Sequence, residues 1–460
     1  MKITVQKEQK TVIIGGGIAG LASAWYLQQA EVDYTLLEAS DQFGGLIQTH
    51  QGADCRMELG PDAFITRKPW ALALARDLGL ADDLIAVNNT PERIYVLADG
   101  RLVPLPDGLR LLVPTNIEAF LASPLLSLGG KLRVLMDLLI PARADDSSDE
   151  SLADFVVRRM GQEALDKLAD PLLAGVYNAD MAQQSILATF PQYRALEKRH
   201  GSLIRGMLAS TADAPASDEP ALVSLRDGMS QLIEALVHQL TGDVRANAPV
   251  THIEEGYRVH LADGTIIHAD TLILATPAKV SARLLEQVAP QSADGLQAIR
   301  YAGIGSMSLV YDRGDVPHPL DAYGVVIPSS AGRMIDGMQW SNSKWINRAP
   351  DHQALIRVFY GGPHTRYMLD KSENELLAIV REELRAILGI TAKPLNYHQG
   401  TWNDAYPQYD VGHIERITEI EHALPNTIRL AGNAYHGVGI PDTVKTAQTA
   451  VQDLLTIITS

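Results

Sequence analysis

The sequence contains one cysteine, Cys55, among 460 residues. A single cysteine cannot form an internal disulfide or a cysteine-based metal cluster, and its scarcity fits a reducing cytoplasm. Long apolar runs are also absent, because the longest weakly charged one, residues 119–130, is shorter than the about 20 residues that a membrane span needs. The first residues, MKITVQKEQK, contain no apolar signal region. We therefore expect a cytoplasmic protein that is either soluble or peripherally bound to a membrane.

An excess of positive charge is absent as well. The chain has 39 lysines and arginines against 55 aspartates and glutamates, a formal net charge of −16. This balance predicts no nucleic-acid partner and no broad attraction to anionic membranes, although a local basic pocket is compatible with it. With 46% hydrophobic residues, a chain of 460 residues can bury a large core, and its length favours two or three domains.

A dinucleotide-binding motif lies near the start of the chain. The apolar residues 12–14 predict a buried strand that ends in a glycine-rich turn followed by a helical pattern. In such a motif Gly15 makes the tight turn, Gly17 lets the backbone approach a pyrophosphate, and Gly20 lets the helix pack close to the strand. Glu38, after a second short strand, is positioned to accept the ribose hydroxyls. The predicted cofactor-binding residues here are Gly15, Gly16, Gly17, Ile18, Ala19, Gly20, Glu38 and Ala39.

A second glycine pair follows and identifies the dinucleotide. Residues 38–46 (EASDQFGGL) resemble the EAxxRxGG extension of FAD-binding flavoproteins of the amine oxidase type. An NAD protein would not need this extension, which lets a loop run flat against the cofactor diphosphate. Gln42 stands where that family usually has an arginine, so a positive charge is missing there. Gly45 and Leu46 join the predicted FAD contacts, and a simple glycine hairpin turn is the alternative.

The C-terminal region contains a third glycine-rich segment. Residues 428–442 predict a strand, a glycine-rich loop and the start of an amphipathic helix that extends to about residue 457. This geometry offers backbone amides and the positive end of a helix to an anion. We expect that anion to be the N1–C2=O edge of a reduced flavin, with Val438, Gly439 and Ile440 in contact. The helix would then favour the two-electron-reduced state.

Between these motifs the pattern changes twice. Residues 93–106 predict a hairpin, and residues 116–140 predict a long helical region with a broad apolar face, either a buried helix pair or a face on a membrane interface. Polar linkers are expected at 144–150 and 212–220. Residues 281–424 predict a mixed sheet with a covering helix. The predicted strands there are residues 307–311, 324–328, 334–340 and 354–360, with the helix at 372–388.

We therefore expect an α/β fold: a Rossmann-type FAD-binding domain with an inserted mixed-sheet substrate domain and a helical domain. The expected FAD-binding domain is discontinuous and comprises residues 1–88, 222–280 and 425–460. The helical domain, which contains the candidate membrane-facing helices, comprises residues 89–221, and the substrate-binding domain residues 281–424.

As a set, further segments resemble the oxygen-dependent porphyrinogen oxidases of haem biosynthesis, the coproporphyrinogen and protoporphyrinogen oxidase family. The matching segments are GPDAF (60–64), RKP (67–69), GVY (175–177), ATFP (188–191), HGSLI (200–204), SKW (343–345), PQY (407–409), VGH (411–413), AGN (431–433) and GVGIPD (437–442). They occur in the family's order over nearly the whole chain. The resemblance implies further FAD contacts at Gly60, Pro61, Asp62, Ala63, Val250 and Trp402.

The same resemblance implies the chemistry. Non-covalently bound FAD would oxidise a porphyrinogen in a six-electron reaction, with O2 as acceptor and hydrogen peroxide as product. No catalytic side chain and no metal are expected, because the flavin transfers the hydride. His200 and His413 lie in family motifs, but each is expected to be a packed histidine rather than a proton carrier.

Substrate binding is expected to depend on a few cations and a large cavity. Arg67 and Lys68 are the candidates for holding propionates, although they also fit surface charges beside a helix. Gly175 and Asn178 are expected to line the substrate cavity, and Asn178-Ala179 replaces the family's usual Ala-Gly there. The absence of a spanning helix favours coproporphyrinogen III over protoporphyrinogen IX. The expected contacts are a membrane surface or a ferrochelatase-type enzyme that receives the product.

Two other functions fit the same motifs. A flavin amine oxidase or a carotenoid-type desaturase would use the same fold, and a non-enzymatic flavin-binding protein is a third alternative because fold does not determine function.

Overall fold

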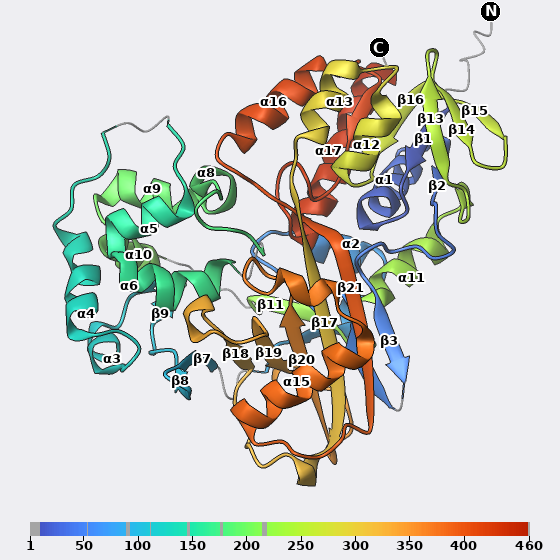
Figure 1. Cartoon of the computed structure of the whole chain (residues 1–460). Coiled ribbons are helices and arrows are strands. Elements are labelled where there is room, and N and C mark those ends of the chain that lie inside the picture. The colour runs from blue at the N-terminus through green and yellow to red at the C-terminus, as the bar shows by residue number, and fades with distance from the viewer. Residues whose placement is uncertain are drawn as a thin grey trace, which may run out of the picture.

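The computed structural model describes residues 10–52, 54–88, 93–110, 112–144, 148–174, 178–213 and 219–458. Figure 1 shows three parts: a parallel sheet with helices on both faces at the top, a group of helices at the left, and a larger sheet at the bottom. This is the α/β fold class that the sequence predicts. The predicted linkers at 144–150 and 212–220 lie partly outside the described residues.

The parallel sheet has the strand order β12-β2-β1-β16-β22. Its strands are β1 (Thr11–Ile14), β2 (Tyr34–Leu37), β12 (Asp243–Arg245), β16 (Thr271–Leu274) and β22 (Ile428–Leu430). All four residues of β1 are buried, because side chains alternate between two faces that are both covered. Ile13 packs into the apolar core on one face, whereas Val12 and Ile14 pack into the core on the other.

Helices cover both faces of this sheet. On one side lie α1 (Ile18–Gln29), α2 (Trp70–Asp77), α11 (Ser230–Gln239) and α17 (Ile440–Ile458). On the other lie α12 (Ala278–Leu285), α13 (Pro290–Gln297), α16 (His413–Ala423) and the small sheet of β13 (Val250–Glu254), β14 (Arg258–Leu261) and β15 (Ile266–His268). The first and last helices of the chain, α1 and α17, pack against each other, so the N-terminal and C-terminal glycine motifs belong to one part.

The larger sheet has the strand order β21-β17-β20-β19-β18-β7-β8. Its strands are β7 (Ile94–Ala98), β8 (Arg101–Pro104), β17 (Tyr301–Asp312), β18 (Gly324–Val326), β19 (Gly337–Trp340), β20 (Gln353–Tyr360) and β21 (Asn396–Pro407). Helix α15 (Glu373–Leu388) packs on it, and begins with a capping box between Ser372 and Glu375. The four predicted strands and the predicted helix of this region are confirmed, and β17 is longer than predicted.

The predicted hairpin at residues 93–106 is also confirmed, as β7 and β8. However, β7 pairs in parallel with β18, so the hairpin extends the larger sheet rather than the helical part to which the sequence analysis assigned it. Shorter elements connect the sheets. They are β3 (Thr49–Gly52), β4 (Cys55–Glu58), β5 (Phe64–Ile65), β6 (Leu84–Ala86), β11 (Leu222–Leu225) and α14 (Ser341–Lys344).

The helical part contains the helical region predicted at residues 116–140. The segment forms two helices, α3 (Ile117–Ala122) and α4 (Leu128–Leu135), and a short 3-10 turn, Met136–Leu138. Pro124 lies in the break, where a proline disfavours helix continuation, and the Ser127 side chain caps α4 by accepting the N–H of Gly130. The other helices are α5 (Leu152–Met160), α6 (Gln162–Ala164), a π-helical segment (Leu165–Ala174), α8 (Ile186–Thr189), α9 (Pro191–His200) and α10 (Leu203–Asp213).

Across the described part of the chain, no helix is both long enough and apolar enough to cross a membrane.

Candidate flavin site

In the glycine-rich turn after β1, packing crowds Gly15, Gly16 and Gly20 but not Gly17. Gly15 has a φ of +108°, and a Cβ there would lie 2.7 Å from the Ala275 carbonyl oxygen. A Cβ on Gly20 would lie 1.8 Å from the Gly15 carbonyl oxygen. A Cβ on Gly17 would meet nothing within 4 Å. Protein packing therefore does not explain Gly17, whereas a ligand approaching the start of α1 would, which is the fit expected for a dinucleotide diphosphate.

Glu38 lies at the end of β2, beside this turn. Its Oε2 accepts the N–H of Gly16 at 2.6 Å, and its Oε1 accepts the N–H and hydroxyl of Ser40, both at 2.8 Å. These bonds orient the carboxylate and leave acceptor capacity on Oε2 for a ribose hydroxyl. The neighbouring Ala39 is exposed.

The loop that contains the second glycine pair, Gly44 and Gly45, contacts the glycine-rich turn after β1. The Gly44 N–H donates to the Gly16 carbonyl at 2.9 Å, and Gly44 and Gly45 have φ values of +111° and +58°. Gly60 lies equally close on the other side, because a Cβ there would be 1.7 Å from the Leu46 carbonyl oxygen. A cavity of about 400 Å³ opens beside this loop. It is lined by Gln42, Phe43, Ile47, Gln48, Thr49, His50, Leu59, Ser230, Ile233, Glu234 and His398.

Asp62, in the turn of residues 60–63, has partners at the end of α14. Its Oδ2 accepts bonds from Lys344 Nζ at 2.9 Å and Trp345 Nε1 at 2.8 Å. Burial opposes ionisation, but the charges of Lys344 and Arg357 hold the pKa of Asp62 well below its usual range. The carboxylate is therefore ionised, and its bonds to Lys344 and Trp345 hold the turn of residues 60–63 in place. Pro61 and Ala63, on either side of it, are half-buried.

Sequence reasoning did not assign roles to these cations. The SKW segment at 343–345 was noted only as a family match, and Arg357 gave no signal, because it lies in the middle of the apolar strand β20. Arg357 Nη2 donates to the Gly60 carbonyl at 2.8 Å. The predicted FAD contact Trp402, on β21, donates its indole N–H to the Leu59 carbonyl at 3.3 Å. The larger sheet thus supports the 59–63 turn through two side chains, Arg357 and Trp402.

The C-terminal motif forms a turn between β22 and α17. Tyr409 connects its two ends: its hydroxyl donates to the Asn433 carbonyl at 2.8 Å and accepts the Gly437 N–H at 2.7 Å. Gly437 has a φ of +131°, and a Cβ there would lie 2.5 Å from the Asp442 carboxyl carbon. Val438 and Gly439 lead directly into α17, which begins at Ile440. The amides of its first turn have no intrahelical acceptors, so the end of this helix can receive an anionic ligand edge.

His413 packs behind this turn. Its ring stacks on Tyr409 with 3.9 Å between ring centroids, and Nε2 lies 3.2 Å from the Tyr435 carbonyl oxygen. Burial lowers the pKa of His413 to about 4, against the effect of its bond to Tyr435. It is the packed, neutral histidine that the sequence analysis favoured.

The predicted substrate residues differ in their surroundings. Lys68 Nζ forms an ion pair with Asp442 at 2.6 Å, and Arg67 is exposed. Asn178 is buried, has a φ of +48°, and donates its side-chain amide to the carbonyls of Gly303 and, at 3.3 Å, Gly361. It therefore joins the helical part to the larger sheet. Gly175 lies outside the described residues.

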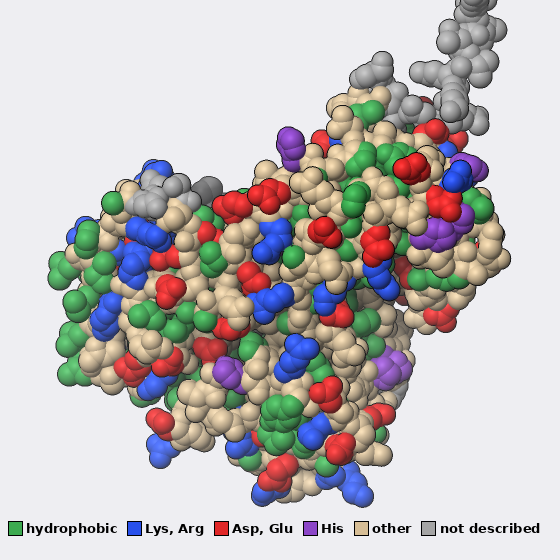
Figure 2. All heavy atoms as spheres, turned by 45° about the horizontal axis from the view of Figure 1, so that its top comes forward, with side chains coloured by type: hydrophobic (Ala, Val, Ile, Leu, Met, Phe, Trp, Pro, Cys, Tyr) green, Lys and Arg blue, Asp and Glu red, His purple; other side chains and the backbone are tan. Residues whose placement is uncertain are grey.

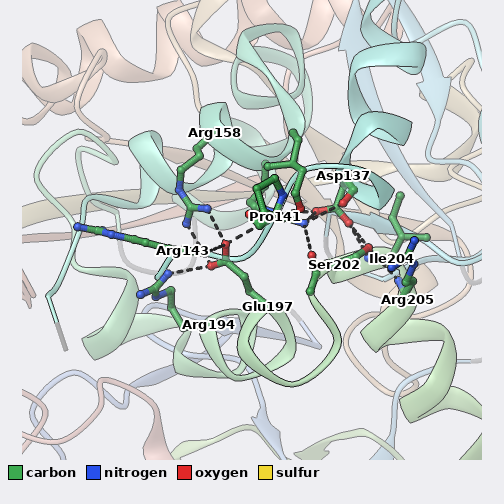
Figure 3. A network of polar contacts seen from close by, with 12 residues as sticks. Asp137, Pro141, Arg143, Arg158, Arg194, Glu197, Ser202, Ile204 and Arg205 are labelled. Atoms are coloured by element: carbon green, nitrogen blue, oxygen red, sulfur yellow. Dashed lines mark hydrogen bonds and ion pairs between the residues drawn. The ribbon is translucent and has the colours of Figure 1, made fainter. Parts of the chain in front are cut away.

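The HGSLI segment at 200–204 is a structural junction of the helical part (Figure 3). Asp137 accepts the Ser202 hydroxyl at 2.5 Å and the Ile204 N–H at 3.0 Å, and it pairs with the fully buried Arg159. Beside it, the buried Glu197 accepts bonds from Arg158 and Arg194. The network explains the serine of this turn, and the φ of +69° at Gly201 explains the glycine, without giving either a role in catalysis.

Val250, a predicted FAD contact, begins β13 and is partly buried in the core that covers one face of the parallel sheet. The described residues thus bring the glycine turns 15–20, 44–46 and 60–63 into one contiguous set, as the contacts among Gly16, Gly44, Leu46 and Gly60 show. The 437–440 turn belongs to the same part of the molecule, because α17, which follows it, packs against α1.

Residues 18–455 match the family of flavin containing amine oxidoreductases, and the chain belongs to this family. It is an FAD-dependent oxidoreductase, which confirms the cofactor that the sequence predicted.

Among curated relatives, a coproporphyrinogen III oxidase of Bacillus subtilis (strain 168) is 34% identical, over 98% of this chain and 99% of that protein. A coproporphyrinogen III oxidase of Staphylococcus aureus is 30% identical over 97% and 99%. Among solved structures, a protein of Exiguobacterium sp. 255-15 with a provisional protoporphyrinogen oxidase name matches with a TM-score of 0.87 and 30% identity over 99% of both chains. Putrescine oxidase matches with a TM-score of 0.73 and 17% identity, covering 97% of this chain and 99% of that one, and shares the fold.

Proposed function

We propose that this protein oxidises coproporphyrinogen III to coproporphyrin III, using bound FAD and O2. The full-length similarity to proteins named coproporphyrinogen III oxidase carries the proposal. The reaction removes six electrons in three steps, and each step reduces one O2 to hydrogen peroxide. FAD supplies the hydride-accepting chemistry in every step.

The side chains of this protein bind and orient rather than react. Glu38 and the glycine turns hold the dinucleotide, and the start of α17 lies where it can stabilise negative charge on the flavin edge. Arg67 is the exposed cation beside α2 that is available to a propionate. No nucleophile or metal enters this proposal, because hydride leaves the methylene bridge of the substrate and protons leave the pyrrole nitrogens.

Protoporphyrinogen IX is the alternative substrate, since a chloroplast protoporphyrinogen oxidase of Arabidopsis thaliana is 29% identical over 96% of this chain. The two substrates differ in carrying two propionates or two vinyl groups at the same positions. Steady-state porphyrin fluorescence with each porphyrinogen separates them, and we expect kcat/KM to be at least about tenfold higher for coproporphyrinogen III. A ratio below one would assign the enzyme to protoporphyrinogen IX. Turnover of an amine or a polyene without porphyrin formation would refute both.

We also propose that the helical part contacts a membrane surface in the cytoplasm. Leu128, Leu132, Met136 and Leu139 are 70%, 55%, 48% and 80% exposed, and their spacing puts them along one side of α4 and the turn after it. Leu121 of α3 extends this apolar stripe. Figure 2 shows apolar side chains gathered at the left edge of the molecule, over the helical part. An amphipathic face of this kind is typical of helices that lie in a lipid interface.

Co-sedimentation with phosphatidylcholine vesicles tests the membrane proposal. The double variant Leu128→Ser, Leu132→Ser should lose binding, whereas Ile266→Ser, which changes a similarly exposed residue on β15, should retain it. Equal sedimentation of all three proteins would refute a specific face. Binding to a ferrochelatase-type enzyme instead of vesicles, lost in the same double variant, would assign the stripe to product transfer.

A further inference from the structure

Three metal-ligating side chains lie together on the hairpin of β13 and β14. His252 and Glu254 are two residues apart on β13, so their side chains share one face of the strand. His260 is the direct cross-strand neighbour of His252, and it lies on the same face. Among the described residues this is the one group of three histidine, cysteine or acidic side chains whose ligand atoms all lie within 4.8 Å of one another.

We propose that His252, Glu254 and His260 form a binding site for one divalent transition-metal cation, best matched by Zn²⁺. The sequence analysis expected no metal, because the flavin transfers the hydride and a single cysteine excludes a cysteine-based cluster. Strand register, which the spacing of these residues does not reveal, brings the third ligand into place. Nothing in the proposed oxidase reaction uses this site.

The distances fit a tetrahedral ion. Zn²⁺ holds imidazole nitrogen and carboxylate oxygen at about 2.0–2.2 Å, which puts two ligand atoms of a tetrahedron about 3.3–3.6 Å apart. His260 Nε2 lies 3.2 Å from Glu254 Oε2, and His252 Nε2 lies 3.6 Å from Glu254 Oε1. The two imidazole rings stack with 4.2 Å between centroids, so small side-chain rotations suffice to direct both nitrogens at one ion. A fourth position would remain for water.

The hydrogen bonds around His252 favour the tautomer that binds a metal through Nε2. Thr251 Oγ1 donates its proton to the His260 carbonyl at 3.1 Å. The same hydroxyl lies 3.1 Å from His252 Nδ1, so it can only accept there, and Nδ1 must carry the hydrogen. Nε2 then has a free lone pair on the side of Glu254. Thr251 thus fixes the tautomer of His252, as the hydrogen-bond acceptors beside metal-binding histidines do in known metal sites.

His260 supplies an independent observation. Its Nε2 is buried and makes no hydrogen bond, although it lies near Glu254. Buried ring nitrogens normally have a partner, and a bound cation would provide one. The hairpin itself is a rigid platform, because Ile253 and Val259, on its opposite face, are completely buried in the core.

Arg258 competes with a metal for Glu254. It is the cross-strand neighbour of Glu254, and its Nη2 lies 2.7 Å from Oε2. The Arg258 side chain is 49% exposed and can turn away into solvent. Removing it should therefore strengthen metal binding, an effect that a purely structural ion pair would not produce.

The test is a calorimetric titration with Zn²⁺ of the FAD-containing protein, without a histidine tag. We expect one Zn²⁺ per chain. His252→Ala, His260→Ala and Glu254→Gln should each weaken binding at least tenfold, and Arg258→Gln should tighten it severalfold. His238→Ala, which removes an exposed histidine on α11, is the matched control and should leave the affinity unchanged.

Flavin content and metal-free thermal unfolding establish that each variant is folded. Co²⁺ in place of Zn²⁺ gives a second readout, since a tetrahedral site produces visible absorption that the variants should lose. Absence of Zn²⁺ binding by the parent protein, or stoichiometric binding that persists in the His252→Ala, His260→Ala double variant, would overturn the proposal.

Discussion

Lys68 Nζ lies 2.6 Å from Asp442 Oδ2 and so connects the segment before α2 to the first turn of α17. The two adjacent cations that the sequence analysis treated as a pair therefore differ. Asp442 is within the GVGIPD segment at the proposed flavin edge, and its side chain is only 12% exposed. Lys68 neutralises it, whereas Arg67 has no ion-pair partner among the residues that the structure describes.

This difference predicts separate effects for the two residues. Arg67→Gln should raise KM for the tetracarboxylate coproporphyrinogen III more than for protoporphyrinogen IX, with flavin content unchanged. The increase should be at most about fivefold if the cation stays exposed, and about 10–150-fold if the substrate desolvates it. Lys68→Gln should instead reduce FAD retention, because it leaves Asp442 unpaired. The KM values of the single variants and of the Arg67→Ala, Lys68→Ala double variant are compared for both substrates. Small and equal changes would show that neither residue binds a propionate.

Gly17 and Gly20 should respond oppositely to the same substitution. In Gly17→Ala the new methyl group meets no protein atom within 4 Å and the backbone is extended, so the free energy of unfolding of the apoprotein should change by less than about 1 kcal/mol. FAD affinity should nevertheless fall, because the methyl group occupies the space of the diphosphate. In Gly20→Ala the Cβ would lie 1.8 Å from the Gly15 carbonyl oxygen, so folding itself should suffer. Unaltered FAD affinity in Gly17→Ala would show that the diphosphate lies elsewhere.

Glu38→Ala should weaken FAD binding by about 1.5–3 kcal/mol, which is roughly 10–150-fold in Kd. The substitution removes the carboxylate that accepts bonds from Gly16 and Ser40, and with it the expected bonds to the ribose. Ser40→Ala is the control, because it removes one of the carboxylate's internal bonds and none to the cofactor. Flavin fluorescence during dilution measures the affinity. Retention of FAD as in the parent would exclude Glu38 from the ribose.

FAD should dissociate when the protein is denatured. The one cysteine, Cys55, is 2% exposed in β4 and bonds to Gln353, and no cysteine lies in the C-terminal motif. Precipitation with acid should therefore leave all yellow colour in the supernatant. Flavin that remains in the pellet would reveal a covalent bond to another side chain.

Local signals in the sequence predicted the elements that local chemistry controls. The contact of Gly20 with Gly15, the Asp99-Gly100 turn and the Ser372 capping box each act within a few residues. The strand β21 was not predicted, because its sequence NYHQGTWNDAYP lacks a regular apolar alternation and β17 supplies its pairing. Tertiary pairing overrides intrinsic preference in such strands.

The site was predictable only in its backbone. Glycine turns appear in the sequence, but Asp62 meets Lys344 across 282 positions, and Arg357 reaches Gly60 across 297. The same holds for Lys68 and Asp442, which are 374 positions apart. Because charges of both signs are common in this chain, the sequence alone does not predict which of them form ion pairs, and the fold is needed to identify the partners.

His413 should make the stability of the protein depend on pH. Because burial lowers its pKa to about 4 in the folded state, while an unfolded histidine has a pKa of about 6.5, the unfolded chain binds more protons between these values. The stabilisation from neutral His413 is therefore complete above pH 6.5 and is lost as pH falls towards 4. Between pH 7 and pH 4.5 the parent should lose about 2–3 kcal/mol more of its free energy of unfolding than His413→Gln, which cannot become charged. Urea denaturation at the two pH values measures this difference, and His238→Gln, at an exposed site, should behave like the parent. The same pH dependence in His413→Gln and the parent would mean that the imidazole is already protonated, or solvated, in the folded protein.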